Sequence, residues 1–201
     1  MKKSVLEGTP RHNPYRRFAG RIFYVLATKA LRVVNLLSPA TYMRLYLPLL
    51  RLYGMRFVGK PRHIGRVYFD DLNRIEIGDR TGISDQVVFL THDYSCTVAL
   101  RAIGEPLPCD TALVSGIKIG NNVFVGMRTI ILPNTQVGDN VIIGAGSVVK
   151  GRIPANSVVQ GNPAKVVTTI ENYATYCSFA LASGMGRMGR SNGDVPAVVQ
   201  S

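Results

Sequence analysis

The chain has 201 residues, of which 46% are hydrophobic and 18% are charged, and its formal net charge is +12. This length fits one domain with an appendage and argues against two domains of equal size. The basic excess is local, because residues 1–66 hold 14 Lys or Arg against one acidic residue, whereas residues 67–201 hold 10 against 11. So large an excess within one segment indicates an anionic partner for that segment.

The three cysteines Cys96, Cys109 and Cys177 cannot all form pairs, and their spacing fits no zinc motif. We therefore expect reduced cysteines in a cytoplasmic protein. The apolar run 22–28 ends at Lys29 without a convincing small-residue cleavage site, which argues against a signal peptide.

A basic arm and two amphipathic helices are predicted within residues 1–66. Apolar residues of the segment 15–37 recur at steps of three and four, with Arg and Lys between them, as in a helix with one apolar face. Ser38 and Pro39 fit the N-cap and first-turn proline of a second helix that runs to Leu52.

Two roles are open for this helix pair, and they are compatible. No charge-free run approaches the ~20 residues that a membrane-spanning helix needs. The helices can cap the open end of the domain that follows them. They can also lie on an anionic membrane, with apolar side chains in the interface and basic ones toward the lipid headgroups.

A six-residue period dominates residues 67–168. Neither a helical period of 3.6 nor the alternation of a hairpin sheet explains it. A period of six fits a short strand with positions one and five inward, followed by a turn that Gly or Asn can accept, and three such sides close one triangular coil. The clearest blocks each open with an aliphatic residue, at Ile119, Val125, Ile131, Val137, Ile143 and Val149.

The period fails between residues 94 and 116, which predicts a loop outside the coil, the kind of segment that often carries function. Pro106 and Pro108 favour an extended path through this loop. Residues 169–201 are predicted to form a short helix over 170–182, covering the last turn of the coil, and then a flexible tail.

Three motifs follow one another at the end of the repeat. They are Gly-Ala-Gly-Ser-Val-Val at 144–149, Ile-Pro-Ala-Asn-Ser-Val-Val at 153–159 and Gly-Asn-Pro-Ala-Lys at 161–165. Together they resemble the closing signature of the hexapeptide-repeat acyltransferases, in the branch of sugar and antibiotic O-acetyltransferases. The resemblance implies a mainly β fold, a left-handed parallel β-helix with an N-terminal helical segment.

His92 is the one histidine within the repeat, and it stands where the coil gives way to the loop. In the resembling family a histidine at the corresponding place removes the proton of the acceptor hydroxyl, which implies a catalytic role for His92. Imidazole, with a reference pKa of ~6.5, can accept a proton near neutral pH. Asp93 and Asp85 are weak candidates for orienting its ring. His12 and His63 are expected on the solvated surface.

The resemblance also implies acetyl-CoA as acyl donor, bound in a groove between neighbouring subunits of a homotrimer, and no metal. The turn at Gly126 is a candidate donor of the N–H groups that an oxyanion requires. Relatives often have Thr-Lys-Asp where this chain has Lys-Gly-Arg at 150–152. The residues implied to bind acetyl-CoA are Gly126, Met127, Ala145, Lys150, Arg152 and Lys165.

These features predict an acetyl-CoA-dependent O-acetyltransferase that acts on a sugar hydroxyl of a cell-surface or exopolysaccharide precursor, in the cytoplasm or on the inner face of the cytoplasmic membrane. The alternatives are transfer to serine, an antibiotic or an amino sugar, and a binding or scaffold module without catalysis. The γ-type carbonic anhydrases share the coil but need three histidines on zinc, and this coil has one. Nucleic acid is not expected as a partner, because basic charge alone is weak evidence for it.

Overall fold

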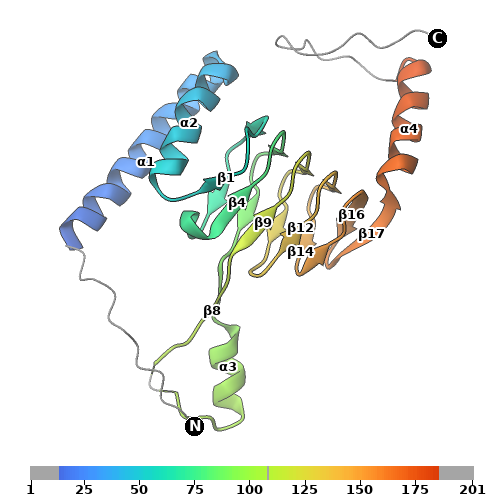
Figure 1. Cartoon of the computed structure of the whole chain (residues 1–201). Helices are drawn as coiled ribbons and strands as arrows, with labels where there is room; N and C mark the ends of the chain where they lie inside the picture. Colours follow the sequence, from blue (N-terminus) through green and yellow to red (C-terminus); the bar gives the residue numbers. More distant parts are fainter. Residues whose placement is uncertain (1–13, 108, 186–201) are drawn as a thin grey trace.

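The computed structural model describes residues 14–107 and 109–185. A helix pair stands at one end of a β coil, a helical excursion leaves the middle of the coil, and a further helix follows its other end (Figure 1). The predicted arm at 1–13 and most of the predicted tail lie outside the described residues.

The two predicted helices are present as α1 (Pro14–Leu37) and α2 (Pro39–Leu52). The Ser38 side chain accepts a hydrogen bond from the Thr41 N–H, which fixes the start of α2 as the sequence predicts. The Tyr42 hydroxyl donates to the Gly65 carbonyl of the coil. α2 therefore covers the first turn of the coil, and the residues that it buries there are Tyr42, Met43, Tyr46, Leu47 and Leu50.

The strands of the coil pass through three sheets in turn, and they are parallel within each sheet except for β17 at the edge of the second. The first sheet contains β1 (Arg56–Phe57), β4 (Ile75–Ile77), β9 (Ile117–Ile119), β12 (Gln136–Val137) and β15 (Arg152–Ile153). The second contains β2 (His63–Ile64), β5 (Gly82–Ile83), β10 (Phe124–Val125), β13 (Ile142–Ile143), β16 (Ser157–Gly161) and β17 (Ala164–Thr169). The third contains β3 (Tyr68–Phe69), β6 (Val88–Phe89), β11 (Ile130–Ile131) and β14 (Val148–Val149).

The register explains the six-residue period. Val125 pairs with Ile143, 18 residues later, so that three blocks make one turn and equivalent aliphatic residues stack inside the coil. The small polar residues at the fifth position are also buried, and their hydroxyl groups donate to carbonyl oxygens at the corners. Ser147 donates to Gly144 at 2.6 Å, and Thr135 donates to Leu132 at 2.6 Å.

The coil begins earlier than the sequence boundary at residue 67, since β1 and β2 pair with strands of the next turn. The mainly parallel β architecture with a helical N-terminal part agrees with the predicted fold class. Among the described helices, none combines the length and apolarity that crossing a membrane requires.

The excursion between residues 94 and 116 is not simply extended. β7 (His92–Asp93) and β8 (Leu113–Val114) form an antiparallel hairpin at its base, and α3 (Ser95–Ala102) follows β7 directly. The expectation drawn from the two prolines was therefore wrong for the first part of the loop. The Asp93 carboxylate accepts a hydrogen bond from the Ser95 N–H at 2.9 Å, which favours the start of this helix.

The C-terminal helix α4 (Ile170–Ala182) has the predicted bounds. None of its residues is buried, although it contacts β16 and β17, so its role as a cover of the last turn stays a prediction. The edge of the second sheet is occupied by β17, which runs antiparallel to β16.

Candidate active site at the His92 corner

His92 lies at the corner between the third and the first sheet, at the base of the hairpin. Phe69 of β3 pairs with Phe89 of β6. The corner that follows Phe69 therefore lies beside the corner that follows Phe89, and it brings Asp70 and Asp71 next to His92.

One side of the imidazole ring is held by Asp70. The distance from His92 Nδ1 to Asp70 Oδ2 is 2.5 Å, and the same oxygen accepts hydrogen bonds from the Thr91 N–H and hydroxyl, each at 3.2 Å. Partial burial tends to raise the pKa of Asp70, but the hydrogen bonds from His92 and Thr91 outweigh burial and hold that pKa below its usual value. Asp70 is thus an ionised acceptor that fixes the plane of the ring.

The other ring nitrogen faces a second carboxylate. His92 Nε2 lies 3.1 Å from Asp71 Oδ2, and the Arg74 Nε lies 3.2 Å from the same oxygen. Arg74 ends the short 3₁₀ helix η1 (Leu72–Arg74), which begins one residue after Asp71. Asp71 is therefore shared between His92 and Arg74.

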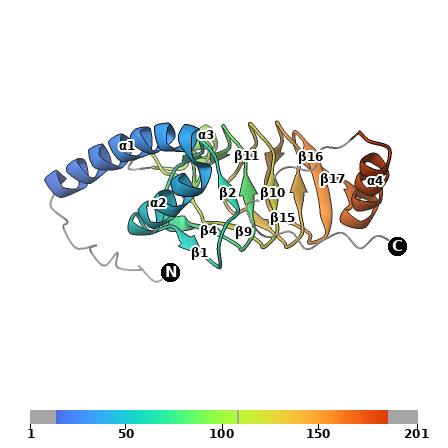
Figure 2. The same cartoon turned by 90° about the horizontal axis from the view of Figure 1, so that it is seen from above.

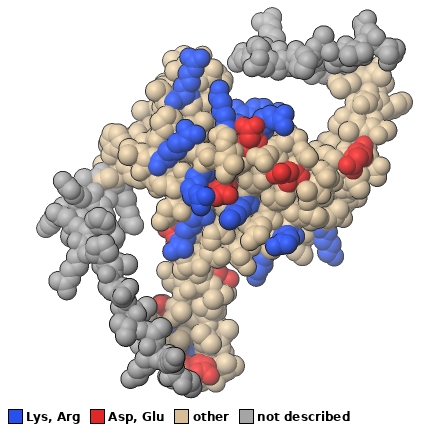
Figure 3. Space-filling model, viewed as in Figure 1, with Lys and Arg blue, Asp and Glu red and all other residues tan. Residues whose placement is uncertain are grey.

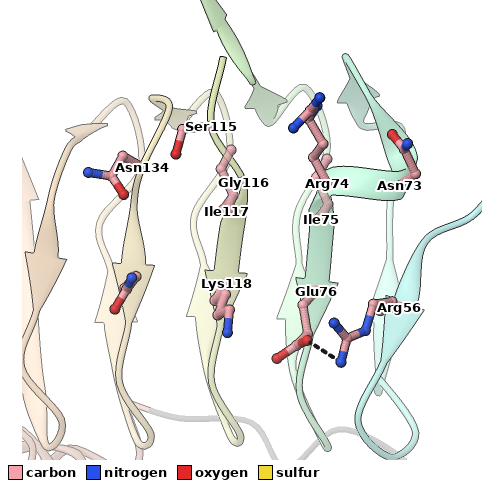
Figure 4. A pocket seen from close by; sticks show the side chains of 11 residues that line it. Arg56, Asn73, Arg74, Ile75, Glu76, Ser115, Gly116, Ile117, Lys118 and Asn134 are labelled. Carbon is pink, nitrogen blue, oxygen red and sulfur yellow. Dashed lines mark ion pairs between the residues drawn. The ribbon is translucent and has the colours of Figure 1, made fainter. Parts of the chain in front are cut away.

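A cavity of about 510 Å³ opens beside His92. Its walls come from the hairpin and from the corners of the next two turns, and they are Leu90, His92, Asp93, Leu113, Val114, Ser115, Leu132, Pro133, Asn134 and Lys150. It shares Ser115 and Asn134 with a smaller hollow of about 220 Å³ on the outer face of the first sheet. In Figure 4, Asn73, Arg74, Ser115 and Asn134 lie at one end of this hollow, and Lys118 and the Arg56–Glu76 ion pair lie at the other.

The predicted acetyl-CoA residues lie on different sides of the coil. Lys150 lines the His92 cavity. Arg152 is exposed on β15 of the first sheet, and Lys165 is exposed on β17. Gly126, Met127 and Ala145 lie at another corner, between the second and third sheets. Within one chain, only Lys150 of this set shares a cavity with His92.

The Gly126 N–H is already used inside the coil, because it donates to the Ile143 carbonyl at 2.8 Å. The Gly126 N–H itself is therefore not available to an oxyanion, and the role of the turn as a source of such donors stays a prediction. Close packing explains why glycine occupies position 126, since a Cβ there would lie 2.5 Å from the Ala145 nitrogen.

Neither aspartate considered from the sequence contacts the His92 ring. Asp93 accepts from the Ser95 N–H, and Asp85 accepts from Arg66. The orienting carboxylate, Asp70, was missed, although extending the repeat one turn back from Phe89 to Phe69 would have placed it beside His92. His63 is half-buried rather than solvated, and burial lowers its pKa.

Residues 116–151 match the family described as "Bacterial transferase hexapeptide (six repeats)". This segment belongs to the bacterial transferase hexapeptide family. The resemblance inferred from the closing motifs is thereby confirmed, and the repeat is hereafter called the hexapeptide coil. No group of three side chains suited to hold a metal ion occurs in the described part of the chain.

Two curated relatives from Escherichia coli K12 are similar to this chain. Galactoside O-acetyltransferase is 33% identical over 115 residues, which cover 57% of this chain and 57% of that protein. The putative lipopolysaccharide biosynthesis O-acetyl transferase WbbJ is 34% identical over 104 residues, which cover 50% of this chain and 53% of that protein. The chain thus spans about half the length of the curated relatives that it matches.

A solved structure described as galactoside acetyltransferase in complex with coenzyme A has the same fold. Its TM-score is 0.52 at 24% sequence identity, and the match covers 83% of this chain and 88% of that chain. The match extends well beyond residues 116–151, so the likeness of fold is not limited to the hexapeptide coil.

Proposed function

We propose that this chain transfers the acetyl group of acetyl-CoA to a hydroxyl group of a sugar. The observation that carries this proposal is the geometry of His92, which lines the cavity and whose Nδ1 is held by the ionised Asp70 while its Nε2 lies 3.1 Å from Asp71 Oδ2. The names of the relatives, a galactoside O-acetyltransferase and a putative lipopolysaccharide O-acetyl transferase, support the same chemistry.

In the proposed reaction the imidazole is neutral, with its one proton on Nδ1 toward Asp70, so that Nε2 can accept another. The acceptor hydroxyl takes the place of Asp71 at this unprotonated Nε2, and Asp71 stays with Arg74. Nε2 takes the hydroxyl proton as the oxygen attacks the thioester carbonyl. The resulting tetrahedral oxyanion collapses, the carbon–sulfur bond breaks, and the departing thiolate takes the proton from the imidazolium. Asp70 keeps the ring in the same orientation and stabilises its positive charge throughout.

Acetyl-CoA fits a site assembled from more than one copy of the chain. Lys150 at the cavity offers positive charge for its phosphates, while Gly126, Met127 and Ala145 lie at a different corner. A homotrimer of left-handed coils would bring the two kinds of corner together between neighbours, with Arg152 and Lys165 near the groove. The outer row of the third sheet supports such an assembly, because it is apolar: Tyr68, Val88, Ile130 and Val148. The solved relative holds coenzyme A.

The acceptor that we propose is a precursor of a cell-surface or exopolysaccharide, modified in the cytoplasm or at the inner face of the cytoplasmic membrane. The hollow next to the His92 cavity offers the amides of Asn73, Asn134 and Gln136 together with charged groups. Such side chains suit the hydroxyl groups of a sugar. The basic segment 1–66 supports a location near anionic lipid.

His92→Ala tests the proposal directly. A general base contributes about 10²–10⁴-fold, so transfer should fall by that factor while the affinity for acetyl-CoA stays nearly unchanged. The assay is release of free coenzyme A thiol with a panel of sugar acceptors, and acetyl-CoA binding is measured by calorimetry. Asp110→Asn in the same excursion is the control, since Asp110 is exposed and pairs only with Arg101 among the described residues. If His92→Ala turns over the acceptor within a few-fold of the parent, the coil is better regarded as a binding module.

A further inference from the structure

The outer side of α1 carries a stripe of exposed apolar residues. Phe23, Leu26, Ala30, Val33 and Leu37 recur at steps of three and four, so they share one face of the helix. The exposed fractions are 57% for Phe23, 60% for Leu26, 59% for Val33 and 84% for Leu37. This set is called the α1 stripe below.

The opposite side of α1 is already occupied. Tyr24, Leu31 and Val34 pack against the core, and the Gly20 carbonyl accepts a hydrogen bond from the Tyr53 hydroxyl at 2.6 Å. The end of the coil is covered by α2, whose buried residues belong to the core cluster. Capping therefore explains α2 and the inner side of α1, but it leaves the stripe unexplained. Figure 2 shows α1 at the end of the molecule, with the coil extending away from it.

The charge around the stripe is of one sign. Lys29 and Arg32 are exposed on α1, and Arg44 and Arg51 are exposed on α2. No acidic residue occurs anywhere between Glu7 and Asp70. On the face drawn in Figure 3, Lys and Arg side chains gather over the helix pair, whereas over the first turns of the coil they alternate with Asp and Glu, as in the Arg56–Glu76 pair. A second copy docked on the stripe would bring like charges together, whereas an anionic surface would neutralise them.

We propose that the α1 stripe docks in the interface of an anionic lipid bilayer, with Lys29 and Arg32 reaching the headgroups. Exposed apolar faces of this extent mark interaction sites, and a helix with apolar and basic residues on its outer side lies in the plane of a membrane surface. In this docking the stem of Lys29 would follow the apolar face while its ammonium group would stay in the headgroup layer. This docking rests on the proposed location of the transferase at a membrane and names the surface that binds there. Lipid binding can be measured without any acetyl transfer.

Vesicle flotation of the full chain tests the docking. The probes are vesicles of phosphatidylcholine with an equal share of phosphatidylglycerol, and vesicles of phosphatidylcholine alone, at low and high salt. Three double variants are compared with the parent chain. Leu26→Gln with Val33→Gln alters the stripe, and Lys29→Gln with Arg32→Gln alters its charge. Phe179→Gln with Leu181→Gln is the matched control, because these residues of α4 are similarly exposed.

We expect the parent chain to float with the anionic vesicles at low salt and to be released by high salt. The stripe variant should bind at least tenfold more weakly, and the charge variant about fivefold more weakly per charge removed at low salt. The α4 variant should bind as the parent does. Circular dichroism and thermal melting check that each variant remains folded.

The proposal is overturned if the parent chain ignores anionic vesicles at low salt, or if the stripe variant binds as well as the parent. It is also overturned if the stripe variant changes the mass of the assembly in sedimentation, because the stripe would then cover another copy. Thiol release with a soluble acceptor separates the two proposals. A chain that docks but transfers no acetyl group refutes the transferase, and a chain that transfers but does not dock refutes the membrane surface.

Discussion

Asp70→Asn and Asp71→Asn are predicted to have different effects on the proposed transfer, although each removes one carboxylate from the same imidazole. Asp70 Oδ2 lies 2.5 Å from Nδ1, the nitrogen that keeps its partner throughout the reaction. Asp71 Oδ2 lies 3.1 Å from Nε2, the nitrogen that must be released to meet the acceptor. Asparagine keeps the shape of each side chain and removes its charge.

The expected magnitude follows from the hydrogen bond that is lost. A hydrogen bond to a charged group contributes about 1.5–3 kcal/mol, which corresponds to roughly 10–150-fold in rate if it is fully expressed in the transition state. The Asp70 and His92 side chains are 24% and 28% exposed, so solvent screening places the effect near the lower end, at about tenfold in kcat/KM. Asp71→Asn should stay within about threefold of the parent, since the acceptor replaces this contact.

The assay is initial-rate release of coenzyme A thiol at saturating acetyl-CoA with a varied acceptor, and melting temperatures check that both variants fold. A loss in Asp71→Asn that equals or exceeds the loss in Asp70→Asn would refute the assigned roles. The ring would then be oriented by Asp71, and the acceptor would have to approach Nδ1.

Three further predictions concern the assembly and the coil. Sedimentation should report about three times the chain mass of 21.9 kDa, and a stable monomer with full turnover would defeat a site shared between copies. Gly126→Ala should destabilise the coil by about 1–3 kcal/mol in chemical unfolding, because its Cβ would lie 2.5 Å from the Ala145 nitrogen. Gly104→Ala is a partial control. The new Cβ meets no atom within 4 Å there, and the φ of +77° adds backbone strain alone. The backbone N–H and the guanidinium of Arg66 hold the pKa of Asp85 below its usual value of 3.8. The ionised carboxylate therefore stabilises the fold at neutral pH. This contribution is lost as the pH falls through the pKa that Asp85 has in the folded chain. The melting temperature of Asp85→Asn should therefore fall less than that of the parent on acidification, and equal falls would contradict the assignment.

The sequence was sufficient to predict the parts of the fold that depend on local pattern. The aliphatic blocks from Ile119 onward recur in equal steps, and Ser38 with Pro39 marks the start of α2 by side-chain chemistry alone. The first turns of the coil were harder to place, because Phe69 and Phe89 pair 20 residues apart while Val125 and Ile143 pair 18 apart. Counting back in steps of six therefore no longer aligns equivalent positions across a turn that is two residues longer.

The same difficulty hid part of the candidate site. His92 could be singled out by its place at the edge of the repeat, but Asp70 contacts it across one turn of the coil, which requires the register of that turn. The helix α3 was missed for a different reason. Its eight residues are too few for a clear helical period, and its N-cap Tyr94 makes no side-chain capping hydrogen bond that would mark its start in the sequence.

The two ends of the hexapeptide coil are closed by different means, and this limits its growth. A stack of parallel strands can in principle continue without end, as it does in fibrils, because each turn presents the same backbone groups to the next. Here α2 covers the first turn, and β17 reverses direction against β16, so that neither end repeats the pattern of the turns between them. Since Val125 and Ile143 occupy equivalent positions 18 residues apart, evolution or design can lengthen this coil in whole turns between two fixed ends.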